Sequence, residues 1–245
     1  MKGLKKNAVL VALLAVGLTF VACKSELDGK PSAEVVDTKK DDKAAEKPAD
    51  KKADDKMADK KDAKPADDKA GAAAKGAAEL KLAVADSKIE AVGSKVTGDH
   101  TVTFKTFDGK GMIKDGNLAD LSFTVQMGEI DNEIENAEFK KKLNDHLKSA
   151  DFFDVANNPT STFKSTAIEA SKDAAGTHTI TGDLTMRGNT KTIKFPATVK
   201  IDDKAVTGKA EFKINRQDFK MAYPGKKDDL IKDDVLLKID LKFNR

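Results

Sequence analysis

The fold of this chain is decided by its last long stretch, Asp234–Phe243, which reads DVLLKIDLKF. Every second residue from Val235 to Phe243 is apolar, and these residues alternate with Asp234, Leu236, Lys238, Asp240 and Lys242. A period of two places alternate side chains on opposite faces of a β-strand. The stretch is therefore predicted to be a strand with one face in a hydrophobic core.

The same alternation recurs upstream in the stretches 121–127, 180–186, 193–201 and 206–214. Short turn signals separate the rows, as at Asp108-Gly109, Asp115-Gly116 and Arg187-Gly188-Asn189. Such short connections suit antiparallel hairpins rather than crossover helices. The pattern predicts a mainly β domain of about eight antiparallel strands, closed as a barrel or stacked as a sandwich.

One segment departs from the period of two. Glu135 to Lys148 places Phe139, Leu143 and Leu147 at helical spacing. We expect one main short α-helix here, inserted among the strands.

The first 22 residues have the features of a secretory signal peptide, with lysines at positions 2, 5 and 6 before an apolar run that ends at Ala22. That run is shorter than the roughly 20 apolar residues that a membrane span needs. Cys23, the single cysteine, follows at once, which resembles a bacterial lipoprotein signal, although Phe20 stands where that pattern prefers Leu. The resemblance implies lipidation of Cys23 and attachment to a membrane.

Residues 24–80 consist almost entirely of Ala, Lys, Asp, Glu and Pro, without an aromatic residue. Such a composition buries too little apolar surface to offset the entropy of ordering, so we predict a disordered spacer. As a flexible coil it would span about 40 Å. A cell-wall-binding role for this segment is the alternative. The predicted organisation is 1–22 signal peptide, 23–81 lipidated cysteine and linker, and 82–245 barrel.

Charge excludes a typical nucleic-acid binder, because residues 81–245 carry 27 basic and 26 acidic side chains without a basic cluster. A catalytic set is also missing from the sequence. The three histidines, His100, His146 and His178, lack metal-ligand spacing, and there is no nucleophile elbow or phosphate loop. We therefore expect a protein that is not an enzyme and holds no metal or cofactor.

Five ordered segments, together with the opening Ser87–Gly93 and Phe107–Gly109, resemble the YceI-like family of lipocalin-like, polyisoprenoid-binding proteins. The five are 139–155 with its HLKSADFFDV end, 159–165 (PTSTFKS), 182–191 (GDLTMRGNTK), 216–219 (RQDF) and the closing strand 235–241. The resemblance covers about Ser87 to Asn244. It implies an exported lipocalin-like antiparallel barrel, and in some members an apolar tunnel that holds a long isoprenoid such as a quinone or prenyl chain.

The resemblance and the inward rows together predict which residues form the wall of the apolar tunnel. Its members are Phe123, Val125, Phe152, Phe153, Phe163, Leu184, Met186, Phe195, Phe212 and Leu237. For Phe152 and Phe153 the alternative is that the two rings simply plug the barrel.

Five polar residues in the family segments allow two interpretations. His146, Asp183, Arg187, Arg216 and Asp218 either form a mouth that meets a lipid head group or make structural ion pairs and turn caps. The function expected is carriage or storage of a long-chain lipid by a lipoprotein of the bacterial envelope. It would face the periplasm and, because no Asp follows Cys23, sit on the outer membrane. A ligand-free structural or interaction module is the alternative, and the resemblance permits a homodimer.

Overall fold

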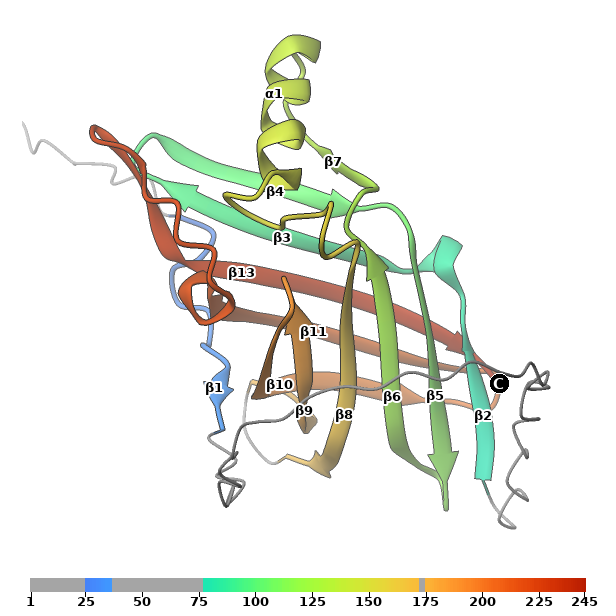
Figure 1. Ribbon diagram of the computed structural model, residues 1–245. Helices are drawn as coiled ribbons and strands as arrows, with labels where there is room; N and C mark the ends of the chain where they lie inside the picture. The colour runs from blue at the N-terminus through green and yellow to red at the C-terminus, as the bar shows by residue number, and fades with distance from the viewer. Residues whose placement is uncertain (1–24, 37–76, 172–174) are drawn as a thin grey trace, which may run out of the picture.

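The computed structural model describes residues 25–36, 77–171 and 175–245 (Figure 1). The helical elements are α1 (Ala137–Lys148), η1 (Val84–Asp86) and η2 (Arg216–Phe219). The strands are β1 (Glu34–Val35), β2 (Ala77–Leu82), β3 (Lys88–Lys95), β4 (Gly98–Phe104), β5 (Phe107–Lys114), β6 (Asn117–Gln126), β7 (Ile130–Asn132), β8 (Thr160–Ala170), β9 (His178–Met186), β10 (Asn189–Ile201), β11 (Ala205–Asn215), β12 (Gly225–Lys226) and β13 (Asp229–Asn244).

Eight of these strands close an antiparallel barrel. The ring runs β2–β5–β6–β8–β9–β10–β11–β13 and returns to β2 through the pairs Phe243–Leu82 and Asn244–Lys81. Beyond the ring, β13 continues along β3, and β3, β4 and β7 extend the same sheet. The predicted mainly β barrel of about eight strands with one main α-helix is confirmed.

Hairpin turns follow the predicted chemistry at two of the three sites named above. Asp115-Gly116 and Arg187-Gly188 both take positive φ at their two central residues, as the tight turns that match strand twist require. Asp108-Gly109 is different, because it lies inside β5 rather than in a turn. A side chain at Gly109 would meet the Ser122 carbonyl at 2.9 Å, so close approach of the neighbouring strand explains this glycine.

Helix α1 begins where Asn136 accepts hydrogen bonds from the backbone N–H groups of Glu138 and Phe139. Figure 1 shows the helix standing out from one end of the barrel. The expected apolar stripe is only partly used, since Leu143 and Leu147 are half-buried while Phe139 is 59% exposed. Phe139 lies about one turn before Leu143 in the helix, and the Nζ atom of Lys142 lies 5.5 Å from its ring centroid.

The barrel interior differs between its two ends. The end near the β13–β2 junction, which we call the packed end, is filled by side chains that include Leu80, Ile113, Val206 and Phe243. The opposite end, which we call the open end, encloses a cavity that is described below. Helix α1 and the loops 149–159 and 220–228 lie at the open end.

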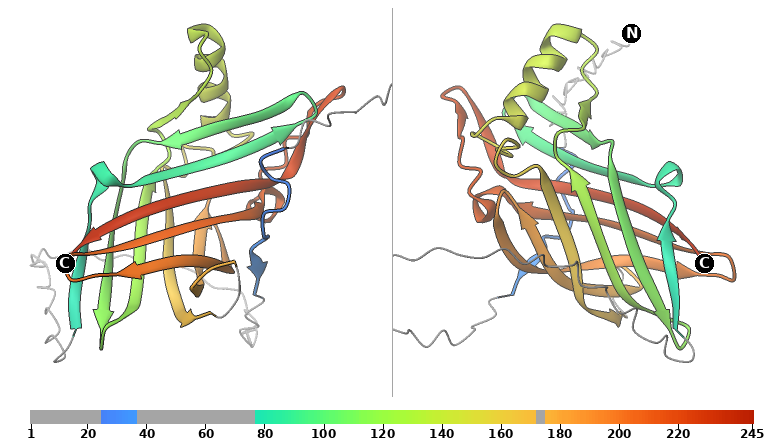
Figure 2. Two further views of the ribbon diagram at one scale, coloured as in Figure 1. Left: turned by 180° about the vertical axis from the view of Figure 1, so that it is seen from behind. Right: turned by 45° about the vertical axis from the view of Figure 1, so that its right-hand side comes forward.

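Two boundaries differ from the sequence prediction. Strand β2 begins at Ala77, so the barrel starts before residue 82. Residues 25–36, predicted as part of a disordered spacer, lie against the outside of the barrel, where β1 pairs with β10 and Leu27 is buried (Figure 2, left). The spacer prediction is therefore wrong for 25–36 and 77–80. The signal peptide, Cys23 and the rest of the spacer lie outside the described residues.

None of the helices in the described ranges is long and apolar enough to span a bilayer.

Candidate ligand cavity

A cavity of about 400 Å³ occupies the open end of the barrel. This volume falls within the range of about 300–1,000 Å³ that small-molecule sites have. Its wall comes from nearly every strand, and most of the side chains are aliphatic or aromatic. A slender apolar molecule therefore matches the cavity in both size and chemistry.

Four phenylalanines from four strands form the floor of the cavity. The rings of Phe123 and Phe163 stack with their centroids 5.2 Å apart, and Phe163 meets Phe195 at 5.6 Å. Phe195 in turn stacks on Phe212 at 4.0 Å. The four rings form one continuous row of aromatic contacts, and each of them lines the cavity on the side toward the packed end.

The row depends on the absence of a side chain at Gly182. A Cβ there would come within 2.5 Å of the Phe163 ring and 2.6 Å of the Lys164 carbonyl oxygen. The absence of a side chain at Gly182 therefore makes room for the Phe163 ring. The space beside Gly182 is filled by this ring and is not part of the space for a ligand.

Phe152 and Phe153 cover the cavity from the loop that follows α1. Phe153 turns into the barrel and meets Phe104 with ring centroids 6.1 Å apart. Phe152 turns outward to Tyr223 at 5.6 Å, and the His146 ring meets both Phe152 and Tyr223 edge-on. All but Phe104 come from loops and the end of α1, so the cover is made by the connections between strands rather than by the barrel strands themselves. The two phenylalanines thus both cap the barrel and line its cavity.

Ser161 supplies a polar group to the otherwise apolar wall. Its hydroxyl is buried and has no hydrogen-bond partner among the described residues. Ser165, on the same strand, is also buried, but its hydroxyl accepts a hydrogen bond of 2.9 Å from the backbone N–H of Leu121. An unpaired buried hydroxyl costs free energy, and a polar group on a bound ligand would remove that cost.

The mouth carries charged and polar side chains. Lys95 and Asp229 pair at 2.5 Å, and the hydrogen bond from Lys95 lowers the pKa of Asp229. His100, His146 and the exposed Lys226 also line the opening. The cavity is therefore apolar inside and polar where it meets water.

The five polar residues named from the sequence fall into separate groups. Of them, His146 lies at the cavity. Arg187 donates hydrogen bonds to the carbonyls of Ala150 and Lys220, and so ties together the two loops that frame the mouth.

Asp183 and Arg216 have structural partners, as the second interpretation anticipated. Asp183 accepts a hydrogen bond of 2.6 Å from Thr192. Arg216 is 3% exposed. It donates hydrogen bonds to the carbonyls of Met221 and Lys232 and forms an ion pair with the Asp233 carboxylate. Asp218 is half-buried in η2, away from the cavity.

All ten residues of the predicted wall line the cavity. They are Phe123, Val125, Phe152, Phe153, Phe163, Leu184, Met186, Phe195, Phe212 and Leu237. That they contact a ligand stays a prediction.

Sequence reasoning missed other parts of the wall. Ile89, Ala91, Val102 and Phe104 line the cavity from β3 and β4, where alternation was present but less regular. Tyr223 and Met221 lie in a loop, which has no periodicity to reveal an inward side chain.

Within the described ranges there is no group of three or more His, Cys, Asp or Glu side chains that could hold a metal.

Comparison with known proteins agrees with this architecture. The family model for the YceI-like domain matches residues 80–243. The chain belongs to this family. It is 37% identical over 95 residues to a UPF0312 protein of Ectopseudomonas mendocina and 36% identical over 123 residues to Protein YceI of Escherichia coli O157:H7. These matches cover 39% and 48% of the chain, and 47% and 61% of the relatives, so the chain spans about half the length of the curated relatives it matches.

Two solved structures share the YceI-like fold. BcnA of Burkholderia cenocepacia aligns with a TM-score of 0.56 at 24% identity, over 66% of this chain and 98% of that one. A polyisoprenoid binding domain from Saccharophagus degradans, implicated in plant cell wall breakdown, aligns with a TM-score of 0.51 at 14% identity, over 67% and 97%. At these identities the likeness establishes the fold alone.

Proposed function

We propose that this YceI-like barrel binds the long apolar chain of an isoprenoid-type lipid, such as a quinone or a polyprenyl compound, and carries or stores it in the bacterial envelope. The observation that carries the proposal is the apolar cavity of about 400 Å³ at the open end. The polyisoprenoid-binding relative of the same fold supports the choice of ligand class.

The driving force would be removal of apolar surface from water, at about 25 cal/mol per Å² buried. Because the Phe123–Phe163–Phe195–Phe212 row closes the floor, the chain would enter from the mouth and end against these rings. The polar end of the lipid would stay near His146 and Tyr223, where the wall becomes polar.

The Ser161 hydroxyl favours a lipid whose head group carries an oxygen, because Ser161 lines the same cavity as His146 and Tyr223 and an isoprenoid chain itself has no oxygen to offer. A carbonyl or hydroxyl at this depth would pair with it, as the protein itself does not. Ser161→Ala should therefore weaken binding of a short-chain quinone about tenfold, if one hydrogen bond of about 1.4 kcal/mol is lost. Ser165→Ala is the matched control, because the Ser165 hydroxyl is engaged with the Leu121 N–H.

We further propose that the protein is anchored to a membrane through lipid on Cys23 and faces the periplasm, on the outer membrane. The apolar run before Cys23 and its place as the single cysteine support this. Acyl chains contribute about 0.8 kcal/mol per buried CH₂, so two or more would hold the protein for long periods. Cys23→Ser should release the full chain into the soluble fraction of the cell.

The deciding experiment is to express the full chain in a bacterial host, purify it gently, and analyse it by native mass spectrometry before and after extraction with organic solvent. A stoichiometric long-chain lipid in the extract is the expected result. A stable protein that is empty and takes up neither an added quinone nor a prenyl lipid would overturn the proposal and favour a ligand-free interaction module.

A further inference from the structure

Residues 25–36 form a strap on the outside of the barrel, beyond the part that matches the YceI-like family. The strap begins at the ends of β3 and β4, crosses β13 and β11, and ends as β1 beside β10 (Figure 2, left). Its backbone is fastened at several points. Ala33 N–H donates to the Lys213 carbonyl at 2.8 Å, Lys213 N–H donates to the Pro31 carbonyl at 2.8 Å, and Val36 N–H donates to the Thr192 carbonyl at 2.8 Å.

The strap also buries apolar side chains outside the barrel. Leu27 is 4% exposed and forms a separate hydrophobic cluster with Val92 and Leu236, both at 0%. Val92 and Leu236 face each other on neighbouring strands, on the outer surface. Leu27 therefore covers two apolar side chains on the outside of the barrel, and this burial stabilises the docking of the strap.

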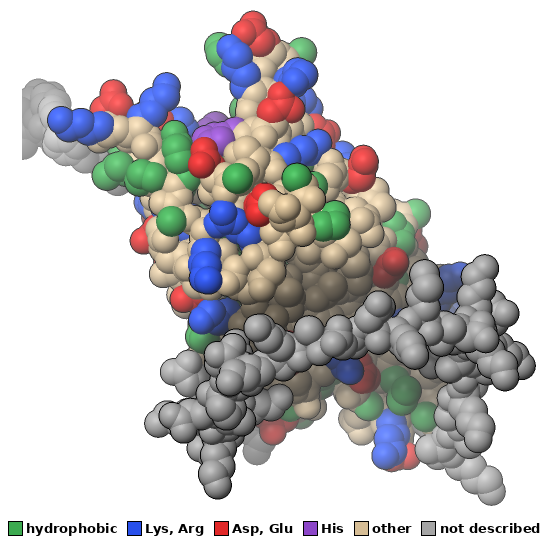
Figure 3. All heavy atoms as spheres, in the orientation of Figure 1, with side chains coloured by type: hydrophobic (Ala, Val, Ile, Leu, Met, Phe, Trp, Pro, Cys, Tyr) green, Lys and Arg blue, Asp and Glu red, His purple; other side chains and the backbone are tan. Residues whose placement is uncertain are grey.

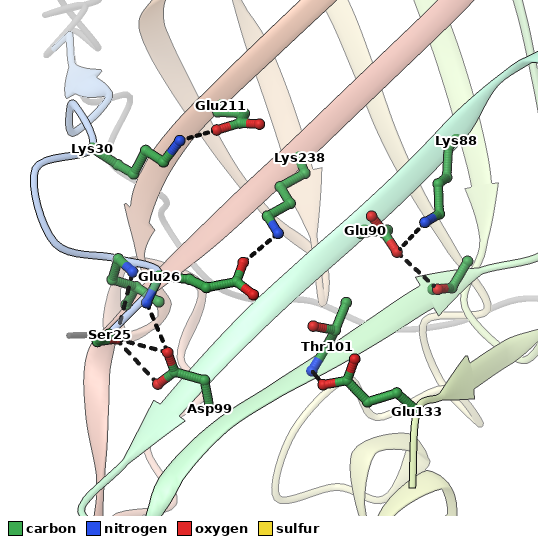
Figure 4. A network of polar contacts seen from close by, with 12 residues as sticks. Ser25, Glu26, Lys30, Lys88, Glu90, Asp99, Thr101, Glu133, Glu211 and Lys238 are labelled. Carbon is green, nitrogen blue, oxygen red and sulfur yellow. Dashed lines mark hydrogen bonds and ion pairs between the residues drawn. The ribbon is translucent and has the colours of Figure 1, made fainter. Parts of the chain in front are cut away.

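Charged and polar contacts surround this cluster (Figure 4). The Ser25 hydroxyl and the Glu26 N–H both donate to the Asp99 carboxylate at 2.9 Å. Glu26 pairs with Lys238, and Lys30 pairs with Glu211. The contacts are spread over β4, β13 and β11, so they fix both the position and the direction of the strap.

The N-terminal end of the strap lies at the mouth of the cavity. Ser25 approaches the Ser94 hydroxyl at 3.5 Å, and both Ser94 and its neighbour Lys95 line the cavity. Cys23 stands only two residues before Ser25, a separation that an extended chain spans with about 7 Å.

Exposed apolar side chains stand on the two hairpin tips at this same end. Val96, in the β3–β4 turn, is 72% exposed, and Leu230, in the β12–β13 hairpin, is 51% exposed. The tips are adjacent, since Val96 N–H donates to the Leu230 carbonyl at 3.2 Å. Exposed Lys226 and Lys227 flank them. Figure 3 shows hydrophobic side chains gathered beside Lys or Arg over these tips, near a histidine.

We propose that the strap holds the N-terminal anchor at the cavity mouth, so that the β3–β4 and β12–β13 tips rest on the bilayer and the mouth opens toward it. Apolar tips flanked by lysines suit the boundary between acyl chains and head groups. A lipid could then pass between bilayer and cavity without crossing water. The inference rests on the membrane attachment proposed above.

The absence of tryptophan from the chain allows a direct test. Leu230→Trp places a single tryptophan at the mouth, and Asp203→Trp places one in the exposed β10–β11 turn at the packed end. Each full-chain variant is purified from bacterial membranes and reconstituted in vesicles of brominated phosphatidylcholine, which quench tryptophan at the bilayer. We expect at least threefold stronger quenching for Leu230→Trp than for Asp203→Trp.

The strap is then broken by Leu27→Asp in each tryptophan variant, with Lys209→Ala as the control. Lys209 pairs with Asp240 at 2.5 Å on the outer surface of the barrel, and among the described residues it makes no ion pair with the strap. Leu27→Asp should make the two tryptophans equally quenched, whereas Lys209→Ala should leave their difference unchanged. Circular dichroism confirms that each variant keeps its barrel.

Equal quenching with an intact strap would overturn the inference, and so would a difference that survives Leu27→Asp. Mass spectrometry of the N-terminal peptide tests the lipid on Cys23 separately. If that lipid is absent, coupling Cys23 to a maleimide lipid anchors the chain at the same residue, and the quenching comparison still decides the orientation. Failure of the attachment and failure of the orientation are thus told apart.

Discussion

The two ends of the barrel are built from the same strands and the same alternation, yet one is solid and the other hollow. At the packed end, Ile113 is 2% exposed and Phe243 is 3% exposed, and both belong to the hydrophobic core and do not line the cavity of the open end. At the open end, β7 pairs with β4, and within the described residues it does not pair with β8. The loop that carries Phe152 and Phe153 covers the cavity at this end. Alternation therefore decides which side chains face inward, whereas closure by strands or by loops decides whether the interior is filled.

The largest contrast should appear when large side chains are shortened. Ile113→Ala at the packed end should lower the free energy of unfolding by about 2–5 kcal/mol, because it leaves a new cavity among fixed neighbours. Leu237→Ala should cost less, since Leu237 is half-buried and already borders empty space. Unfolding of both variants in urea, without bound lipid, measures the difference. Equal losses would mean that the two ends are equally packed.

Enlarging a side chain should show the same contrast in stability between the packed core and the cavity. Ala197→Phe, in the packed core, should destabilise the barrel by about 1–3 kcal/mol through overpacking. Ala91→Phe enters the cavity and should leave the unfolding free energy nearly unchanged while it abolishes uptake of a fluorescent prenyl lipid. Lipid uptake that persists in Ala91→Phe would place the ligand elsewhere.

Two glycines offer a finer version of the same comparison. Gly182→Ala should destabilise by about 1 kcal/mol or more, because the new Cβ would lie 2.5 Å from the Phe163 ring. Gly93 lines the cavity and has nothing within 4 Å of a built Cβ. Gly93→Ala should therefore stabilise by up to about 1 kcal/mol, through the lower entropy of the unfolded chain. Thermal unfolding of the matched pair tests the sign of each effect.

Much of this architecture follows from the sequence. The inward rows of Leu121–Met127, Ile180–Met186 and Val235–Phe243 predicted the antiparallel strands and their buried faces, because the period of two is a local property of each strand. The rows left a barrel and a sandwich open, and the YceI-like resemblance favoured the barrel. The YceI-like segments predicted that Phe152 and Phe153 either line the cavity or plug the barrel. Neither could predict the cavity's size, which depends on how α1 and the loops settle on the open end.

The strap was missed because composition describes a segment on average. Residues 24–80 are polar as a whole, yet the apolar side chain of Leu27 packs against Val92 and Leu236 on the outside of the barrel. The barrel offered one weak trace of that site, because Leu236 interrupts the otherwise charged row of Asp234, Lys238, Asp240 and Lys242. A single apolar side chain on a solvent face is common in proteins, so this trace did not reveal the strap.

The smallest expected effect is the response of the strap to pH. Burial raises the pKa of Asp99, but hydrogen bonds from Ser94, the Glu26 N–H and Ser25, with the charge of Lys232, lower it more, so its pKa lies below the usual value. The stabilisation that Asp99 gives to strap docking is therefore present above about pH 4, the ordinary range of an aspartate, and is lost as the pH falls through the depressed pKa.

Lys238 acts in the opposite direction. The hydrogen bond to Glu26 raises the pKa of Lys238, so its contribution is present below about pH 10 and is lost as the pH rises through the raised value. The strap should therefore stay docked on the barrel between about pH 4 and about pH 10. An NMR titration of the Glu26 amide should show release of the strap in acid, and Asp99→Asn, which cannot titrate, should remove the part of the transition that comes from Asp99. An unchanged acid transition in Asp99→Asn would show that Asp99 does not hold the strap, and the mouth end would then depend on Leu27 and the Glu26–Lys238 pair alone.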